Sequence, residues 1–155
     1  MACQGRQDKM DKVLTIRTDY LDDAFRDPEY IADKACKALK DVNYDTMVGI
    51  GLSGSLVVPI LARALGKYWC IVRKEDGSHT HNRVEGQIGQ RCLFVDDCVD
   101  SGRSRERVKS VIEEVCSQNG HWDKFGTRCA FPTEWIGTYT YMNNKYDPHD
   151  RVDRY

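Results

Sequence analysis

The pattern of apolar and polar positions predicts an alternation of short buried strands and amphipathic helices. Continuous apolar runs at residues 47–50, 68–72 and 92–95 are typical of strands buried on both faces of a parallel sheet. Beside these runs, apolar residues recur at intervals of three and four, which is the pattern of helices that cover a sheet. The sequence therefore predicts an α/β fold, with a Rossmann-like central parallel sheet of about five strands flanked by helices.

Local signals place the three predicted helices. Asp27 and Pro28 form a cap followed by a first-turn proline, so the first helix begins there. The second helix begins at about Ser55, because Pro59 must lie near its first turn, and Gly66 ends it. The third helix carries an apolar stripe opposite a charged face. The stripe consists of Val108, Val111, Ile112 and Val115, and the charged face of Arg105, Glu106, Lys109, Glu113 and Glu114.

The remaining segments carry weaker signals. Alternation over residues 13–17 predicts a short half-buried strand, and residues 126–130 and 137–141 are two further strand candidates. Residues 75–90 have no apolar period and include three glycines, as expected of a functional lid or a disordered segment. The polar tail from residue 142 is predicted to be loop.

One stretch, residues 92–104, combines several chemical signals. Its apolar run ends in two adjacent carboxylates, Asp96 and Asp97, and a third follows at Asp100. Carboxylates at the end of a strand are hydrogen-bond acceptors suited to sugar hydroxyls or to a hydrated Mg²⁺. The turn that follows leads into a helix, whose N-terminal amides would bind a phosphate. This turn consists of Ser101, Gly102, Arg103 and Ser104. Together these groups predict a site for a phosphorylated sugar.

Two further stretches predict anion-binding groups at the same edge of the sheet. The strand at residues 47–50 runs into a Gly/Ser loop and then a helix, which provides a second helix N-terminus. The loop consists of Leu52, Ser53, Gly54 and Ser55. The strand at residues 68–72 is followed by Arg73 and Lys74, two cations suited to a phosphate or pyrophosphate.

Each of these signals has a structural alternative. Paired acids before a helix could belong to an ordinary connection between a strand and a helix, with one acid capping the next element. The Gly/Ser loop could be a simple connection, and Arg73 and Lys74 could be a solvated strand end. Response-regulator receiver domains also have paired acids after a strand, but near the start of the domain. Here only 59 residues (155 − 96) follow Asp96, so we reject that alternative.

Residues 92–104 resemble the phosphoribosyl pyrophosphate (PRPP) motif of type I phosphoribosyltransferases. That motif has four mostly apolar residues, two acids, a short linker and Ser/Thr-Gly-x-Ser/Thr. The resemblance covers about residues 31–130 and implies a single domain over residues 1–155. It also implies a flexible loop at about residues 75–90 and a small hood formed by the N- and C-terminal segments. Loop side chains that could reach a pyrophosphate are His79, His81 and Arg83.

The resemblance implies transfer of ribose 5-phosphate from PRPP to a nucleobase, which gives a nucleoside monophosphate and pyrophosphate. Asp96 and Asp97 would hold the ribose hydroxyls and contact Mg²⁺ mainly through water. The turn at residues 101–104 would hold the 5′-phosphate, and the loop at residues 52–55 the pyrophosphate. The residues expected to act in catalysis are Asp100, Arg73 and Lys74.

The base-binding residues are the weakest part of the resemblance. In 6-oxopurine enzymes, an Asp at the position of Asp100 lies near the purine ring, so Asp100 favours a purine. A lysine at the end of the next strand reads the purine oxygen in those enzymes, but Phe131 stands about there in this sequence. Trp135 and Arg128 are the other candidates for a base pocket that is atypical. The competing hypothesis is a non-catalytic PRPP- or nucleotide-binding regulatory protein on the same fold.

Composition bears on the partners and the location of the protein. The formal net charge of −1 gives no global field to attract nucleic acid or an anionic membrane, and no apolar run has the length of a membrane span. The seven cysteines include no C-x-x-C pair, which argues for reduced thiols in a cytoplasmic protein. Cys36, Cys70, Cys92, Cys116 and Cys129 are predicted core residues, and Cys98 is expected to be exposed. A homodimer is common in the family.

Overall fold

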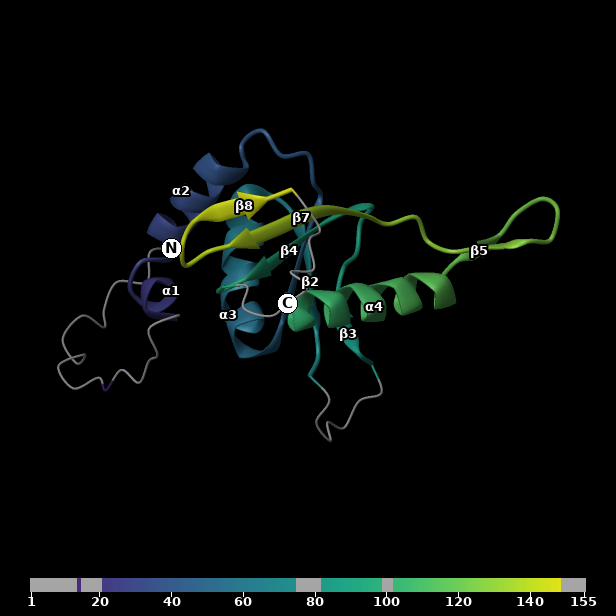
Figure 1. Ribbon diagram of the computed structural model, residues 1–155, viewed down its shortest axis with the longest axis horizontal. Coiled ribbons are helices and arrows are strands. Elements are labelled where there is room, and N and C mark those ends of the chain that lie inside the picture. Colours follow the sequence, from purple (N-terminus) through teal and green to yellow (C-terminus); the bar gives the residue numbers. More distant parts are fainter. Residues whose placement is uncertain (1–13, 15–20, 75–81, 99–101, 149–155) are drawn as a thin grey trace, which may run out of the picture.

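A six-stranded sheet forms the centre of the molecule (Figure 1). The computed structural model describes residue 14 and residues 21–74, 82–98 and 102–148. In spatial order, the strands are β3 (Val84–Gly86), β2 (Tyr68–Val72), β1 (Thr46–Ile50), β4 (Arg91–Asp96), β7 (Glu134–Thr140) and β8 (Lys145–Asp147). The helices are α1 (Asp22–Arg26), α2 (Pro28–Leu39), α3 (Gly51–Leu65) and α4 (Arg103–Gln118). No helix in the described ranges is long and apolar enough to cross a membrane.

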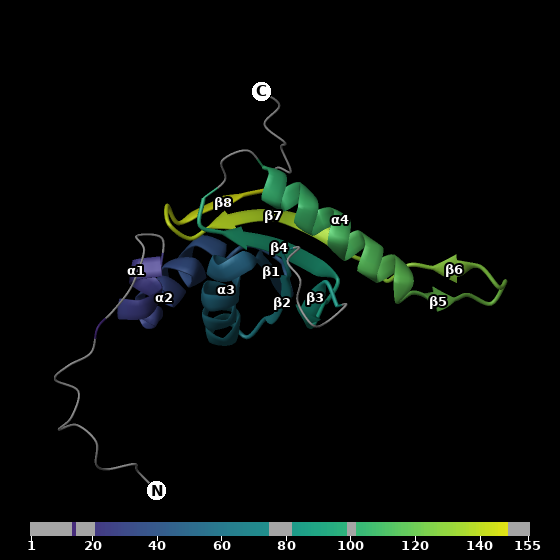
Figure 2. The ribbon, with the colours of Figure 1, turned by 90° about the horizontal axis from the view of Figure 1, so that it is seen from below.

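The predicted fold class is confirmed. Strands β2, β1, β4 and β7 are parallel neighbours, and the two edge strands β3 and β8 are antiparallel to the strands beside them. Helices α2 and α3 cover one face of the sheet, and α4 covers the other (Figure 2). The sheet is therefore mostly parallel, with helices on both faces.

Several local predictions are wrong. Strand β3 lies within the segment predicted to lack structure, and β8 lies in the tail predicted to be loop. Only Arg128–Cys129 (β6) is extended in the candidate strand at residues 126–130, and it pairs with β5 (His121–Trp122) in a separate hairpin. The candidate strand at residues 137–141 largely coincides with β7, which begins earlier, at Glu134, and is the fourth parallel strand, so the core sheet extends past residue 130. The strand predicted at residues 13–17 lies outside the described residues except for Leu14, which is exposed.

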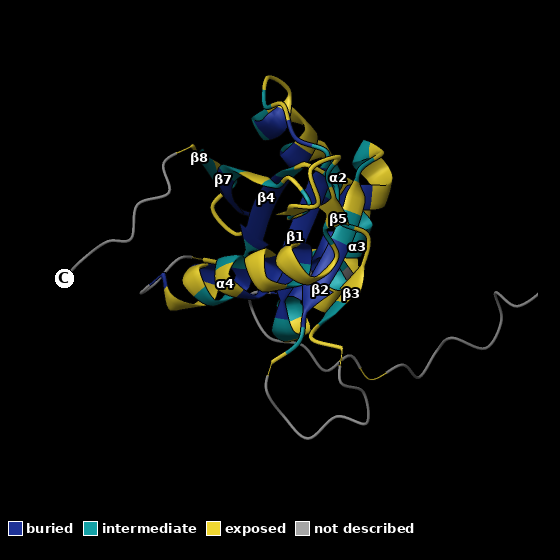
Figure 3. Ribbon diagram, turned by 90° about the vertical axis from the view of Figure 1, so that its right-hand side faces the viewer, coloured by how far each residue is buried: buried dark blue, intermediate teal, exposed yellow. Residues whose placement is uncertain are grey.

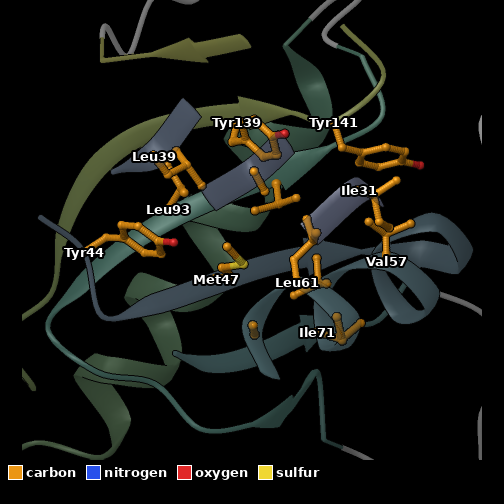
Figure 4. Packing of buried hydrophobic residues seen from close by; sticks show 14 of the residues in the cluster. Ile31, Leu39, Tyr44, Met47, Val57, Leu61, Ile71, Leu93, Tyr139 and Tyr141 are labelled. Atoms are coloured by element: carbon orange, nitrogen blue, oxygen red, sulfur yellow. The ribbon is translucent and has the colours of Figure 1, made fainter. Parts of the chain in front are cut away.

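The core has one apolar layer on each face of the sheet. On the first face, the buried residues of α2, Ile31, Ala35 and Leu39, pack with α3 and with Tyr139 of β7 (Figure 4). On the second face, the predicted stripe of α4 packs against β1, β2 and β4. The sheet between the layers is mostly buried, while the outer faces of the helices are exposed (Figure 3). Burial of both faces explains why the central strands read as continuous apolar runs.

The cysteines differ in how far they are buried. Cys70, Cys92 and Cys116 are buried, as predicted, and Cys98 is exposed, as expected. Burial raises the pKa of the Cys92 thiol to about 12, so this thiol is not ionised at neutral pH. The core prediction is wrong for Cys36, which lies on α2 outside its buried stripe and is exposed.

Asp45 braces the end of the sheet at which the parallel strands begin. Its carboxylate accepts hydrogen bonds from the Thr46 hydroxyl (2.6 Å) and from the backbone amides of Gln90 (3.0 Å) and Arg91 (3.1 Å). Burial by itself would raise the pKa of Asp45, but these hydrogen bonds outweigh it and hold the pKa below its ordinary value. The ionised form of Asp45 therefore stabilises the fold.

We expect Asp45→Ala to lower the free energy of unfolding by about 2 kcal/mol at pH 7, because it leaves the Gln90 and Arg91 amides without their acceptor. The folded pKa lies below the unfolded one, so the contribution is present above the unfolded pKa and is lost as the pH falls through the folded pKa. Urea unfolding at pH 7 and pH 3.5 measures both effects. The exposed Asp41→Ala serves as control, and an equal loss in the two variants would contradict the prediction.

Candidate functional site

The candidate site lies where β1 and β4 end side by side. From β1 the chain continues through α3 to β2 on one side, whereas β7 follows β4 on the other side. This reversal of strand order is a topological switch point, at which open α/β sheets bind their ligands beyond the carboxyl ends of the strands. Gly51 follows β1 there, and Asp96 ends β4. The fold therefore brings together the first Gly/Ser segment and the paired acids.

Lys74 joins these two parts of the site. A Cβ built on Gly51 would lie 2.8 Å from Cε of Lys74 and 3.3 Å from its Nζ, so the lysine side chain lies directly against Gly51. Its charge also reaches the Asp96 carboxyl and acts to lower the pKa of that group. Gly51 has a φ of 70°, which favours glycine. An ammonium group thus stands beside the N-terminus of α3 and within electrostatic reach of the acids.

Arg73, the other predicted catalytic cation, contacts the edge strand β3. Its Nη2 lies 3.1 Å from Oε1 of Glu85 on the edge strand β3, and its backbone N–H donates to the Arg83 carbonyl (2.8 Å). Arg83 in turn pairs with Glu114 of α4 (2.9 Å). These contacts tie β3 to β2 and to α4. Arg73 therefore braces the edge of the sheet, and Lys74 is the cation beside the acids.

Asp96 and Asp97 are partly buried, and a hydrogen bond from a backbone N–H to a side chain links them. The Asp97 N–H donates to Oδ1 of Asp96 (2.9 Å), and the Cys98 N–H donates to Oδ1 of Asp97 (2.8 Å). Burial raises the pKa of Asp96 to about 7, and the neighbouring Asp97 carboxyl contributes to this shift. Asp96 therefore changes its ionisation near neutral pH, where a ligand that needs its charged form would bind with proton release.

We expect Asp96→Asn to stabilise the free protein at pH 8. The folded pKa is raised, so the contribution of Asp96 to stability is present below its unfolded pKa and is lost as the pH rises through about 7. The shift corresponds to at most about 4 kcal/mol, which screening by water reduces to on the order of 1–2 kcal/mol. Urea unfolding of wild type and variant at pH 5 and pH 8 tests this, and a difference that shrinks as the pH rises would contradict it.

The N-terminus of α4 follows the acids along the chain and could bind an anion. Gly102 precedes the helix with a φ of 75°, and no side chain among the described residues caps the helix. The amides of Arg103 and Ser104 are in the first turn, where an anion can take the place of a cap. Of the predicted phosphate turn, Gly102 is buried and Arg103 and Ser104 are exposed. Asp100 and Ser101 lie outside the described residues, as do His79 and His81.

Arg105 is a charged residue of this region that the sequence prediction placed wrongly. It was assigned to the exposed face of α4, but it is only 4% exposed, and its Nη2 would lie 3.8 Å from a Cβ built on Gly102. A signal was present in the sequence: Arg105 precedes Val108 by three residues and Ile112 by seven, so it continues the buried stripe. A buried guanidinium beside the α4 N-terminus adds to the positive character of the anion site.

The Gly/Ser segment after β1 is the first turn of α3 rather than a loop. The helix begins at Gly51, so the prediction that it begins at about Ser55 is wrong. Leu52 and Ser55 are exposed, Ser53 is half-buried, and Gly54 is buried. The Ser55 hydroxyl donates to the Gly51 carbonyl (2.7 Å), which leaves the helix N-terminus without a side-chain cap. Amides of the first turn can therefore bind an anion at this second N-terminus.

The predicted base-binding residues lie at the wrong end of the structure. Trp135 pairs with Cys92 at the start of β4, whereas Thr140 pairs with Asp96, so Trp135 lies roughly 15 Å from the acids along the strands. The Phe131 N–H donates to the Cys116 carbonyl, and Arg128 donates to the Gln118 carbonyl (2.6 Å), both near the end of α4 farthest from the anion site. These three residues do not line the candidate site.

The residues that directly follow β7 lie beside the two acids. Backbone N–H groups of Tyr141 and Met142 donate to the carbonyls of Asp96 (3.0 Å) and Asp97 (3.4 Å). Met142 is 49% exposed, so an apolar side chain stands at the strand end nearest the acids. The sequence prediction missed Met142 because it assigned residue 142 to a polar tail and placed the base-binding residues around residues 128–135.

The described residues do not form a metal site by themselves. No group of three His, Cys, Asp or Glu side chains in the described ranges is arranged to hold a metal ion. Asp96 and Asp97 supply two hard oxygen donors, and Mg²⁺ is commonly held by one or two carboxylates together with water and substrate phosphates. The donor set therefore fits a Mg²⁺ that arrives with a phosphorylated ligand.

Comparison with other sequences gives distant relatives. No model of a known protein family matches this chain. The transcriptional regulator GfcR of Methanocaldococcus jannaschii is 30% identical in an alignment of 100 residues, and the match covers 57% of this chain and 47% of that protein. The transcriptional regulator GfcR of Methanocella arvoryzae is 26% identical in an alignment of 86 residues, and the match covers 48% of this chain and 42% of that protein. The chain thus spans about half the length of the curated relatives that it matches.

Comparison with solved structures defines the fold. The orotate phosphoribosyltransferase of Mycobacterium tuberculosis in complex with PRPP matches 77% of this chain and 64% of its own chain, with a TM-score of 0.55 and 20% identity. A phosphoribosyltransferase from Corynebacterium diphtheriae matches 74% of this chain and 65% of its own, with a TM-score of 0.54 and 23% identity. The protein therefore has the fold of the type I phosphoribosyltransferases. At this level of identity the likeness concerns the fold alone.

Proposed function

We propose that this protein binds PRPP and transfers its ribose 5-phosphate to a nucleobase, with release of pyrophosphate. The observation that carries the proposal is the position of Lys74 between the N-terminus of α3 and the carboxyl of Asp96. A cation and a helix N-terminus suit a pyrophosphate, and adjacent carboxylates suit ribose hydroxyls. The N-terminus of α4 lies one loop beyond the acids and suits the 5′-phosphate.

In this proposal the protein stabilises charge rather than supplying a nucleophile. Breaking the bond between C1 of the ribose and the pyrophosphate leaves positive charge on the sugar and negative charge on the leaving group. Lys74 and the first-turn amides of α3 would stabilise the pyrophosphate. Asp96 and Asp97 would orient the ribose and favour its positive charge. Mg²⁺, bound through the substrate and the water around these acids, would neutralise part of the pyrophosphate charge.

The proposal also concerns which base accepts the ribose 5-phosphate. Asp100 favours a purine, by resemblance to the 6-oxopurine enzymes. The residues that follow β7 are Tyr141 and Met142, however, and neither offers the cationic donor that reads the purine oxygen in those enzymes. Adenine and pyrimidine bases therefore belong in the first panel of substrates beside hypoxanthine, guanine and xanthine.

A regulatory function is the second candidate. It is favoured by the two curated relatives, both of which are called transcriptional regulators, and by the absence of Trp135, Phe131 and Arg128 from the candidate site. Such a protein would bind PRPP or a nucleotide through the same groups without transferring the ribose.

We expect pyrophosphate release when the protein is incubated with PRPP, Mg²⁺ and the correct base. The assay follows pyrophosphate across the panel of bases, and calorimetry measures PRPP binding in parallel. Turnover with one base supports the enzyme. Binding without turnover on any base supports the regulatory candidate, and an absence of PRPP binding contradicts both.

A further inference from the structure

A hairpin arm projects from the body of the molecule beyond the C-terminus of α4 (Figures 1 and 2). We define the arm as residues 119–131, which contain β5, β6 and the turn between them. The Asp123 carboxylate closes the turn by accepting hydrogen bonds from the amides of Phe125 (2.9 Å) and Thr127 (2.8 Å). At the root, Arg128 donates to the Gln118 carbonyl (2.6 Å) at the end of α4. The arm is therefore a defined structure attached to α4.

The arm exposes its aromatic side chains. Trp122 is 69% exposed and Phe125 is 80% exposed, the highest values among the exposed aromatic side chains in the described ranges. An isolated two-stranded hairpin is at best marginally stable in water, so this arm would gain stability from a partner that covers its exposed rings. Tryptophan is also enriched among the residues that dominate binding energy at interfaces. The arm therefore has the character of an interaction element.

The same chain carries a complementary groove at its other end. This groove lies between α2 and α3 and has a volume of about 350 Å³. Its apolar lining includes Ala32, Ile60, Ala64 and Leu65. Its two charged lining residues, Glu29 and Asp33, are acidic. The tip of the arm carries Lys124 beside Phe125, with the ammonium 5.0 Å from the centre of the ring. An aromatic ring with an adjacent cation matches an apolar groove with an acidic rim.

We propose that the hairpin arm of one copy docks in the α2–α3 groove of a second copy. The arm and the helices α2 and α3, whose residues line the groove, lie toward opposite ends of the long axis (Figure 1), so the arm cannot reach the groove of its own chain. Two copies placed side by side in opposite directions bring each arm to the partner's groove. This exchange closes a two-fold dimer and uses the same contact twice. It does not involve the groups proposed to bind PRPP, so the two proposals can fail separately.

The mass of the protein in solution tests this dimer. Light scattering after size exclusion at 10–100 µM should give twice 17.8 kDa for the wild type and the monomer mass for Trp122→Ala/Phe125→Ala. Because the arm lies outside both core layers, the variant should keep the wild-type circular dichroism spectrum and PRPP binding. A monomeric wild type, or a dimer that survives in the variant, overturns the proposal.

Charge exchange tests whether the groove is the docking site. Lys124→Glu and Asp33→Lys should each weaken the dimer at least tenfold, and their combination should restore most of the affinity because the pair is reversed. A bismaleimide should link position 127 of a Thr127→Cys variant, which keeps Phe125, to the exposed Cys36 that lines the partner's groove. Cys36→Ser should remove that link. A dimer that needs the arm but ignores both groove substitutions would show that the arm docks elsewhere and would overturn the assignment.

Discussion

Replacing Asp96 and Asp97 together by asparagine is expected to weaken PRPP binding at least about 100-fold. Each carboxylate is proposed to accept hydrogen bonds from ribose hydroxyls, and such charge-assisted bonds contribute about 1.5–3 kcal/mol each. Two of them correspond to roughly two to four powers of ten in the dissociation constant. Calorimetry with PRPP and Mg²⁺ at pH 8 measures the change, because Asp96 is ionised there.

The same double variant should not lose stability. Burial disfavours the charge of Asp96 in the free protein, so neutral side chains remove a cost at pH 8. Weaker binding combined with unchanged or higher stability would separate a binding role from a structural one. The exposed Asp41→Asn is the matched control and should bind PRPP like the wild type. Binding by the double variant within threefold of the wild type would remove the acids from the site.

The sequence predicted the centre of the fold because its central strands are buried on both faces. Most residues of β1, β2 and β4 are buried between the helices on the two faces of the sheet. These strands therefore consist mainly of apolar residues and can be predicted from their apolar runs. Edge strands β3 and β8 are short and half-exposed, and they lack such a run. Of the two later strand candidates, residues 126–130 and 137–141, only the second joins the main sheet, and this depends on pairing with β4, which the local sequence pattern cannot predict.

The candidate site could be predicted in its parts but not in its geometry. The acids and the two helix N-termini follow from strand, turn and helix signals along the chain. Arg73 and Lys74, in contrast, are adjacent cations, and the sequence assigned both to the pyrophosphate. Pairing of β3 with β2 directs Arg73 to Glu85, while Lys74 lies against Gly51. Only the tertiary structure separates these two roles.

Gly54 shows how packing and function meet at the same position. A Cβ built on Gly54 would lie 2.9 Å from the Gly49 carbonyl carbon and 3.1 Å from its Cα, which are backbone atoms of β1. Such contacts cannot be relieved by a rotamer change, so the helix itself would have to move. Gly54 is therefore required for close contact between α3 and β1, and that contact fixes the α3 N-terminus beside Lys74.

We accordingly expect Gly54→Ala to lower the free energy of unfolding by about 3 kcal/mol, because an added methyl group overpacks a contact between two backbones. Under conditions where the variant remains folded, PRPP binding should weaken at least tenfold, since α3 is displaced from β1. Gly66→Ala, at the C-cap of the same helix, is the control: its Cβ meets nothing within 4 Å, and its φ of 67° costs about 1–2 kcal/mol. Urea unfolding and calorimetry of both variants measure the effects. Equal destabilisation by the two substitutions, with normal PRPP binding, would mean that the position of α3 does not depend on Gly54.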